Sequence, residues 1–480
     1  MPRQYTARLA VVNSDPILRQ FEATRARRPD APLVVSAAAS WSAEELGRAA
    51  RGLAEELSAS GFGAGDVVGL AAPAPAFVAG YLALRAVAAI PVLCDGVRPT
   101  PDRLGALDRL GAVGFLACAS GWPGAASAWQ IHRRRPDRTL PCDPAWGAIK
   151  LTSGSTGEPR GIAVGSEALL ADDAQLAAAM GLSADDRLVA AVPLSHSYGF
   201  SSLLLPTLVR GSLLVVPEEG SALAPLAAAR RHRATFLPTV PAWLGAYSRL
   251  GEPPPWPESL ARVVSAGAPL PPATAVAFRE RTGREVRVFY GASECGGIAY
   301  DRSGGAAERG TVGTPVPGVE VEVDPQTGRL SVRSPAVAAT YLPEAAAELG
   351  GGRFLTGDRA VLEAGELRLL GRADDVVIVR GRNVDPREVE RAIAAVPGVE
   401  EVCVLGIDGP DGPRSVLRAV VAAPEGGVDA RAVTEACRRE LAAYKIPRSV
   451  VVVAELPRTE RGKVDRAAAA ALGERSALLH

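Results

Sequence analysis

Residues 151–161 read LTSGSTGEPRG and contain three glycines and four hydroxyl side chains. Glycine backbones and hydroxyls of this kind can wrap around phosphate oxygens, and Arg160 adds a positive charge beside them. The spacing is neither that of a Walker loop nor that of the glycine turn that binds dinucleotides, because both need a different placement of glycines. Taken alone, the segment is compatible with a phosphate-binding loop and with a plain linker.

Four further segments follow this loop along the chain. They are Tyr290-Gly291-Ala292-Ser293-Glu294, Thr356-Gly357-Asp358, GRADDVVIVRGRNVDP over residues 371–386, and a pattern of Pro457, Thr459, Gly462 and Lys463. In their order, and over the whole chain, the five segments resemble the adenylate-forming (AMP-binding) superfamily, which includes acyl-CoA synthetases and fatty acyl-AMP ligases. The resemblance implies an acyl-CoA synthetase, a ligase that activates a carboxylic acid with ATP and Mg²⁺.

The resemblance also assigns nucleotide contacts. Tyr290 is expected to flank the adenine, Asp358 to accept hydrogen bonds from the ribose hydroxyls, and Arg372 to assist at the ribose or phosphate. Glu294 and Thr156 are the implied metal ligands. The remaining implied nucleotide contacts are Thr152, Ser153, Gly154, Ser155, Gly157, Gly267, Ala268, Gly291 and Ser293.

The chemistry explains why cations are needed at such a site. Joining a carboxylate to a phosphate brings two anions together, and like unit charges about 4 Å apart repel by ~4 kcal/mol at an effective dielectric constant of 20. By resemblance, Lys463 supplies the ammonium in the transition state, and Glu294 and Arg160 complete the catalytic set. Only three of the 53 basic residues are lysines, and a guanidinium does not replace a compact ammonium. Arg160 stands where the family usually has lysine, which keeps the charge.

Hydrophobic patterning predicts an α/β fold. A helix is expected over residues 42–60, opened by a Ser42/Glu45 capping box, and strands over 67–70, 188–192, 213–216, 262–265 and 286–289. Alternation with period two begins near residue 318, as in an antiparallel hairpin. We expect an AMP-binding domain over residues 1–370, with a β subdomain at about 310–370, and a mobile α+β domain over 371–480. The resemblance places its hinge at Asp374.

The acid substrate is expected to lie between the α/β subdomains, beside His196, Phe200, Thr239, Gly267 and Gly296. Residues 194–203 contain no acid that could hold an ammonium group, which disfavours an α-amino acid. The small residues after Glu294 leave room for an apolar tail, so a fatty or aryl acid is favoured. His196 is compatible with a gate in the active site and with a structural histidine.

The acceptor of the acyl group is left open between two thiols. The segment around Gly381 resembles a loop that shapes a pantetheine tunnel, which suits coenzyme A and a carrier-protein arm. Coenzyme A leads, and the RGRN string at residues 380–383 keeps an acyl carrier protein as the alternative partner. A luciferase-type enzyme that uses oxygen and a non-catalytic nucleotide-binding regulator are the less favoured alternatives.

Composition excludes several other classes. The 53 basic and 53 acidic residues balance, which argues against a nucleic-acid partner. The uncharged stretches 67–84 and 188–209 contain internal glycine and proline, so we expect no integral membrane segment. The six cysteines are scattered and the N-terminus lacks a signal-like apolar run, which predicts a cytoplasmic protein.

Overall fold

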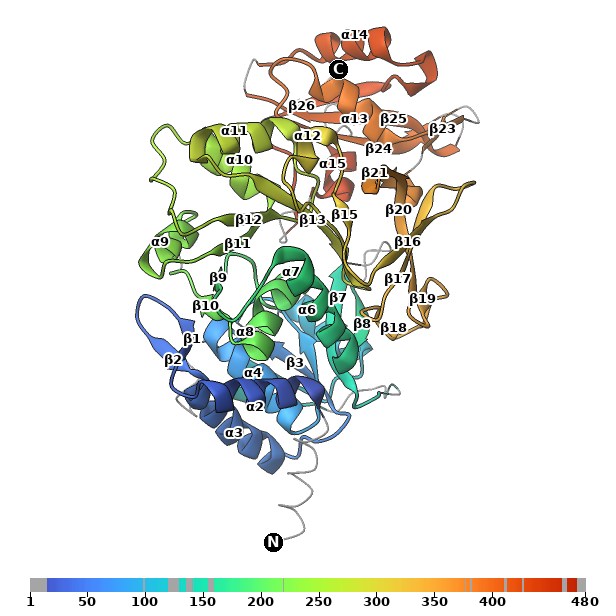
Figure 1. Cartoon of the computed structure of the whole chain (residues 1–480). Helices are drawn as coiled ribbons and strands as arrows, with labels where there is room; N and C mark the ends of the chain where they lie inside the picture. Colours follow the sequence, from blue (N-terminus) through green and yellow to red (C-terminus); the bar gives the residue numbers. More distant parts are fainter. Residues whose placement is uncertain are drawn as a thin grey trace. The chain divides into compact units, whose positions relative to one another are not determined.

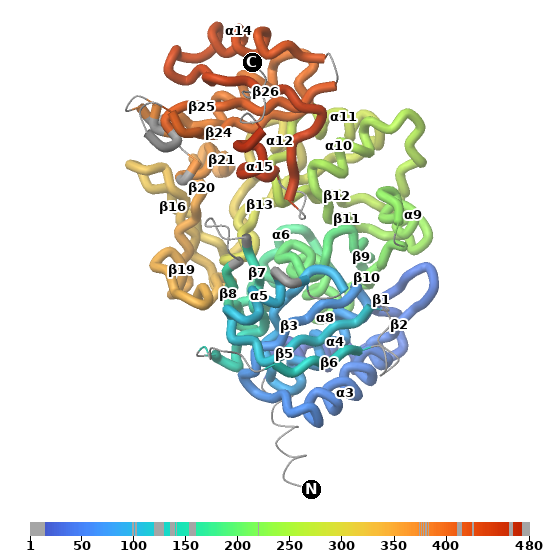
Figure 2. Tube along the Cα trace, turned by 180° about the vertical axis from the view of Figure 1, so that it is seen from behind, coloured from blue at the N-terminus to red at the C-terminus, as the bar shows by residue number. Residues whose placement is uncertain are grey.

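A computed structural model describes residues 15–97, 100–119, 129–134, 140, 142–153, 159–218, 220–375, 377–379, 382–409, 412–424, 427–459 and 464–472. The chain divides into two compact units. Unit 1 comprises Met1–Glu322, Ser331–Leu355 and Glu363–Leu367, and unit 2 comprises Val323–Leu330, Thr356–Leu362 and Arg368–His480. Figure 1 labels the helices and strands, and Figure 2 gives the opposite view.

A nine-stranded sheet forms one half of unit 1, in the order β15-β14-β13-β12-β11-β9-β10-β1-β2. Its inner strands from β1 to β13 pair in parallel, and antiparallel pairs close both edges. The strands are β1 (Pro32–Val35), β2 (Ser40–Ser42), β9 (Arg187–Val189), β10 (Leu213–Val215), β11 (Phe236–Thr239), β12 (Arg262–Ser265), β13 (Val286–Ala292), β14 (Gly296–Tyr300) and β15 (Thr314–Pro315).

A seven-stranded sheet forms the other half of unit 1, in the order β18-β8-β7-β4-β3-β5-β6. Strands β7 and β8 make an antiparallel hairpin that flanks residues 154–158, which lie outside the described residues. The strands are β3 (Val67–Ala71), β4 (Ile90–Leu93), β5 (Gly114–Cys118), β6 (Trp129–Arg133), β7 (Trp146–Ser153), β8 (Pro159–Gly165) and β18 (Thr340–Leu342).

Helices pack on these sheets through apolar faces. Helix α3 begins after Ser42 with the expected capping box to Glu45, and α10 and α11 lie side by side next to β12 (Figures 1 and 2). One buried apolar cluster joins α10, α11 and β12, and it contains Tyr247, Phe278 and Val263. The helices are α2 (Pro16–Arg27), α3 (Ala43–Ala59), α4 (Ala74–Ala86), α5 (Pro101–Arg109), α6 (Ser166–Met180), α7 (Ser197–Gly199), the π-helical turn η2 (Phe200–Leu204), α8 (Leu205–Arg210), α9 (Ala224–Arg231), α10 (Pro241–Arg249), α11 (Pro272–Thr282) and α12 (Ala306–Arg309).

The border between the units passes through a small group of strands. The hairpin expected after residue 318 is present as β16 (Glu320–Val323) and β17 (Arg329–Arg333). The other strands of this group are β19 (Leu349–Gly350), β20 (Arg353–Glu363) and β21 (Glu366–Arg372). Strand β20 therefore contributes residues to both units.

The rest of unit 2 mixes helices and strands. Strand β24 pairs antiparallel with β25, which pairs in parallel with β26. The elements are the short 3₁₀ turn η3 (Ala373–Asp375), β22 (Val377–Val379), β23 (Arg382–Val384), α13 (Pro386–Ala394), β24 (Glu401–Gly409), β25 (Gly412–Ala422), α14 (Ala430–Glu440), η4 (Ala443–Lys445), β26 (Ser449–Val453) and α15 (Arg466–Ala471). Helix α13 is capped by Asp385, whose carboxylate accepts from the Arg387 amide.

The expected α/β fold is confirmed. Within the described residues, none of the helices has both the length and the apolar character needed to cross a bilayer. The apolar stretch 67–84 instead forms β3 and most of α4, both deeply buried. The rotation of a C-terminal domain about Asp374 remains a prediction.

Candidate active site

The parallel strands β11, β12 and β13 bring several expected site residues to one edge of the nine-stranded sheet. Thr239 pairs with Ser265, and Ser265 pairs with Val288, so these three residues lie side by side across the strands. Residues that follow such strand ends gather at a common edge, which is where open α/β sheets bind ligands. Gly267 and Ala268 are exposed just beyond β12, and residues 290–294 follow Val288 along the chain.

Glu294 lies in the tight turn that joins β13 to β14. The Cys295 amide donates to the Ala292 carbonyl across 3.3 Å, and Gly291 pairs with Gly297. A Cβ at position 291 would lie 2.7 Å from the carbonyl oxygen of Gly296, so a side chain there would not fit. The hairpin thus presents Glu294 from a rigid, closely packed backbone.

Two aligned strands place Arg160 and Tyr341 next to this turn. Strand β18 pairs with β8, with Leu342 opposite Gly161. The Tyr341 hydroxyl donates to Oε1 of Glu294 across 3.0 Å, and the Arg160 guanidinium lies 4.2 Å from the centre of the Tyr341 ring. Burial, followed by the charge of Glu294, raises the pKa of Tyr341, so this hydroxyl stays protonated and donates to the carboxylate.

The expected phosphate loop is described only at its two ends. Thr152 pairs with Arg160 and Ser153 with Pro159, so the ends of β7 and β8 close on each other. The interior positions Gly154, Ser155, Thr156 and Gly157 lie outside the described residues, as does Lys463. Of the loop residues, Arg160 is thus connected to Glu294 through Tyr341, and the other loop assignments remain predictions.

The segment that holds His196 is joined to the same turn. Ser197 Oγ donates to Ser293 Oγ across 2.6 Å, which links α7 to the residue before Glu294. His196 Nε2 lies 2.9 Å from Oδ1 of Asp95, an oxygen that also accepts from Ser195 Oγ at 2.6 Å. The imidazole is therefore anchored by an acid from a distant part of the chain.

The other expected pocket residues differ in exposure. Phe200 is fully buried and packs edge-on against Tyr81, with ring centres 5.4 Å apart. Thr239 is 3% exposed, while Gly296 is half-buried. Phe200 and Thr239 thus belong to the packed interior, and Gly296 lies nearer the surface.

Unit 2 carries Asp358, Arg372 and Asp374. The Asp358 amide donates to Oγ1 of Thr356 across 3.0 Å within strand β20. A Cβ at Gly357 would lie 2.5 Å from Nη2 of Arg372, so the guanidinium lies directly over this part of the strand. The side chain of Asp374 lies outside what is described. Within unit 2, the two residues expected at the ribose are neighbours.

Sequence reasoning missed Tyr341 and Asp95, the partners of Glu294 and His196. Neither residue lies in a recognisable motif, and each is brought in by a strand pairing or loop far along the chain. Ser197 was likewise not singled out, although it stands next to His196.

The donor set suits a hard cation shared with phosphate. Within the described residues, no group of three or more His, Cys, Asp or Glu side chains could hold a metal ion. Mg²⁺ is usually bound by one or two carboxylates together with substrate phosphates, and Glu294 offers one carboxylate. The residues present therefore fit a magnesium ion that arrives with a nucleotide.

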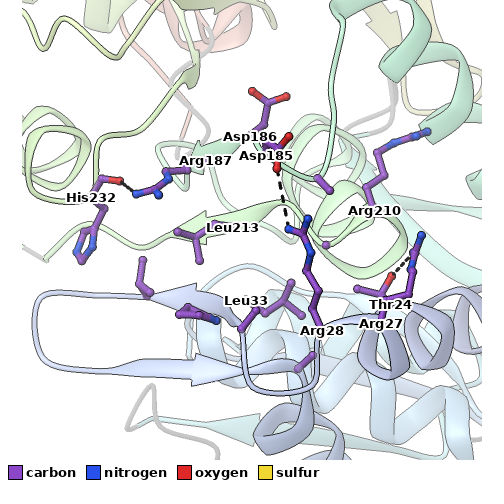
Figure 3. Close-up of a pocket in the computed structure, with 16 residues that line it drawn as sticks. Thr24, Arg27, Arg28, Leu33, Asp185, Asp186, Arg187, Arg210, Leu213 and His232 are labelled. Carbon is purple, nitrogen blue, oxygen red and sulfur yellow. Dashed lines mark hydrogen bonds and ion pairs between the residues drawn. The ribbon is translucent and has the colours of Figure 1, made fainter.

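A cavity of about 490 Å³ lies elsewhere in unit 1. Figure 3 shows Arg28 beside Asp185, at 4.0 Å, and Arg187 donating to the backbone of His232. None of the residues lining this cavity is an expected site residue, and two of its charged side chains, Arg210 and Asp186, are paired with residues outside the lining.

Comparison with protein-family models matches both parts of the chain. Residues 122–342 match the model described as AMP-binding enzyme, and residues 388–463 match the AMP-binding enzyme C-terminal domain.

Individual relatives agree with the family models. The indoleacetate–CoA ligase of Aromatoleum aromaticum is 32% identical over 384 residues, which are 75% of this chain and 74% of the relative. The feruloyl-CoA synthase of an Amycolatopsis species is 32% identical over 66% of this chain and 67% of its own.

A solved structure is similar over nearly the whole chain. O-succinylbenzoate coenzyme A synthetase from Bacillus subtilis, solved with ATP and magnesium ion, has a TM-score of 0.79 at 25% identity. The similarity covers 93% of this chain and 98% of that structure.

Proposed function

Because this chain belongs to the family of AMP-binding enzymes, we propose that it joins a carboxylic acid to coenzyme A through an acyl-AMP intermediate. In the first half-reaction the carboxylate attacks the α-phosphorus of ATP, and pyrophosphate leaves. In the second, the thiol of coenzyme A attacks the acyl carbon, AMP leaves and the thiol proton is released. The cofactors are ATP, Mg²⁺ and coenzyme A.

The observation that carries the proposal is the contact of Glu294 with Tyr341 beside Arg160. Tyr341 holds one oxygen of the carboxylate through a neutral hydroxyl, which adds no competing positive charge. Bound Mg²⁺ would supply positive charge to the triphosphate. We assign Arg160, at the described end of the loop, to phosphate oxygens, which a guanidinium binds well.

The remaining roles are proposed by resemblance. Lys463 is the ammonium that offsets the repulsion between carboxylate and phosphate, and Asp358 and Arg372 hold the ribose. The ribose assignment is supported by the packing of Arg372 over Gly357, next to Asp358. Asp374 is the proposed hinge.

We propose an aryl acid as the substrate, with a fatty acid as the next choice. The two relatives above are named for indoleacetate and ferulate, which are both aromatic acids. Asp95 lies beside His196, so an acid does reach this region from outside residues 194–203. However, it already serves Ser195 and His196 and lies 3.6 Å from Arg103, and we do not assign it to a substrate ammonium.

The proposed location is the cytoplasm. All six cysteines, each within the described part of the chain, are thiols rather than members of disulfides. Thiols persist in reducing compartments.

The test is acid-dependent exchange of pyrophosphate into ATP, followed by detection of the thioester. The acid panel comprises indoleacetate, ferulate, 4-chlorobenzoate, octanoate, palmitate and phenylalanine, each offered with coenzyme A and with a phosphopantetheinylated carrier protein. We expect exchange with an aromatic acid and a coenzyme A thioester. Exchange with phenylalanine alone would refute the substrate class, a thioester on the carrier alone would refute the acceptor, and no exchange with any acid would refute the enzyme.

A further inference from the structure

A group of buried polar side chains lies behind the β13–β14 turn. Lys150 and Asp172 are each 2% exposed and Ser201 is 5% exposed. They come from three elements, strand β7, helix α6 and the π-helical turn η2. Charged side chains are almost never this deeply buried unless they are paired, and a buried polar group costs free energy unless it is hydrogen-bonded. Such a cluster is therefore expected to have a defined task.

Asp172 is the centre of this group because its two oxygens reach two different elements. Oδ2 accepts from Ser201 Oγ across 2.6 Å, and Oδ1 accepts from the Gly297 amide across 3.0 Å. The first contact holds η2, which directly follows the His196 segment. The second contact holds the start of β14, three residues beyond Glu294. One carboxylate thus ties together the two segments that flank the expected acid pocket.

The backbone of β14 packs directly on helix α6 at this point. A Cβ at position 296 would overlap Oδ1 of Asp172, and Gly296 has a φ of +70°, in the left-handed region. A Cβ at position 297 would lie 2.6 Å from Cδ2 of Leu176, one turn along the same helix. Both positions therefore need glycine, and the closeness of helix α6 is the reason.

Lys150 is a buried positive charge that interacts electrostatically with Asp172. Burial lowers the pKa of Lys150, and the opposing influences come from Asp172 first, then Cys295 and Glu294. The lysine is thus electrostatically coupled to the helix acid and to the turn. The ammonium of lysine is more compact than the branched guanidinium of arginine, which suits a buried position.

We propose that Asp172 is a positioning residue that fixes the Glu294–Gly297 turn on helix α6. Resting on the proposed function, this inference gives Asp172 two effects. The carboxylate of Glu294 is held at a constant place relative to the phosphate loop, and the backbone at Gly296–Gly297 forms a fixed floor for the acid substrate. Asp172 touches neither substrate nor metal in this scheme and acts through the turn.

The chain contains a matched control next to Asp172. Asp173 is also 2% exposed and lies on the same helix, but it pairs with Arg210 at 2.7 Å. Asp172→Leu and Asp173→Leu therefore remove the same charge and both carboxylate oxygens from similar depth, with a side chain of similar shape. Only the first removes acceptors from the turn, because leucine cannot accept from Ser201 or from Gly297.

The experiment compares these two variants by hydrogen exchange and by pyrophosphate-exchange kinetics with the best acid of the panel. In Asp172→Leu we expect the Gly297 amide to exchange about tenfold faster and KM for the acid to rise about tenfold, the order for a lost buried hydrogen bond to a charged group. In Asp173→Leu both values should stay within about twofold of wild type. Equal behaviour of the two variants, or unchanged exchange at Gly297 in Asp172→Leu, would overturn the positioning role.

A second variant keeps the test decisive if Asp172→Leu fails to fold. The charge-neutral double variant Lys150→Met/Asp172→Leu removes the uncompensated buried ammonium, so we expect it to be more stable than Asp172→Leu while Gly297 stays unprotected. Full protection of Gly297 in this folded double variant would again refute the proposal. Hydrogen exchange needs no substrate, so it judges Asp172 even if wild type activates no acid, an outcome that would refute only the proposed function.

Discussion

The hydroxyl of Tyr341 donates a 3.0 Å hydrogen bond to Oε1 of Glu294, a residue 47 positions earlier in the chain. The same aromatic ring faces the guanidinium of Arg160, 4.2 Å from the ring centre. The carboxylate proposed to bind Mg²⁺, an aromatic hydroxyl and the cation proposed to contact phosphate are thereby arranged in series. Such an arrangement orients the carboxylate before any ligand arrives, which reduces the reorganisation needed on binding.

Removing the two members of this contact should have different effects. Glu294→Gln removes the charge proposed to hold Mg²⁺, so acid-dependent pyrophosphate exchange should fall by at least about a hundredfold. Tyr341→Phe keeps the ring beside Arg160 and loses only the hydrogen bond, so we expect a loss of about tenfold. Exchange rates measured at several Mg²⁺ concentrations test both variants. A Glu294→Gln enzyme with wild-type exchange would show that the metal ligand lies elsewhere.

Lys463 can be tested against another of the three lysines. Lys463→Ala removes the proposed transition-state ammonium and should lower adenylation by at least about a hundredfold. The control is Lys445→Ala, since Lys445 is engaged with Glu388 within unit 2 and has no proposed part in catalysis. The pyrophosphate-exchange assay compares the two. Similar rates in both variants would remove Lys463 from the catalytic set.

The proposed hinge predicts a separation of the two half-reactions. Asp374→Pro restricts the backbone dihedral φ at that position and should hinder rotation between the adenylating and thioester-forming arrangements. Pyrophosphate exchange should stay within about threefold of wild type, while coenzyme A thioester formation falls at least about tenfold. The two products are measured separately in the same enzyme sample. A parallel loss of both would indicate that residue 374 is not a hinge.

Asp173 gives a prediction about pH and stability. Burial raises the pKa of its carboxyl from 3.8 to about 6, and the charge of Arg210 opposes this only in part. The folded chain therefore binds this proton more tightly than the unfolded chain. The stabilising contribution of this proton is complete below about pH 3.8 and is lost as the pH rises through about 6.

The measurement is the free energy of unfolding in urea for wild type and Asp173→Asn. Between about pH 4 and 6, the wild-type value should decline relative to that of the variant, which has no group to titrate at this position. A difference that is constant over this range would show that Asp173 keeps an ordinary pKa.

Local patterns predicted local structure well. The capping box of Ser42 and Glu45 opens α3 where expected, and the strand over residues 262–265 is β12 with the same bounds. Both features are set by residues that are close together in the sequence, so a short stretch of sequence is enough to predict them.

Contacts between distant segments were not predictable in the same way. Tyr341 and Asp95 reach Glu294 and His196 only through the sheet topology, and no spacing rule connects them. A weak signal did exist for Asp172, because two adjacent acids interrupt the apolar residues of helix α6, and a lysine interrupts those of β7. A charge within an apolar element signals a buried partner, but the sequence alone does not say which one.

The pairing of β18 with β8 also bears on how the chain is made. Leu342 opposes Gly161, so the register that delivers Tyr341 closes a loop of about 180 residues. Contacts of such sequence separation form late, because the chain entropy of closing the loop must be lost before any gain. During synthesis, β8 is therefore an unpaired sheet edge until residue 342 has left the ribosome. A nascent chain stalled before that point would expose a ready template for intermolecular strand pairing.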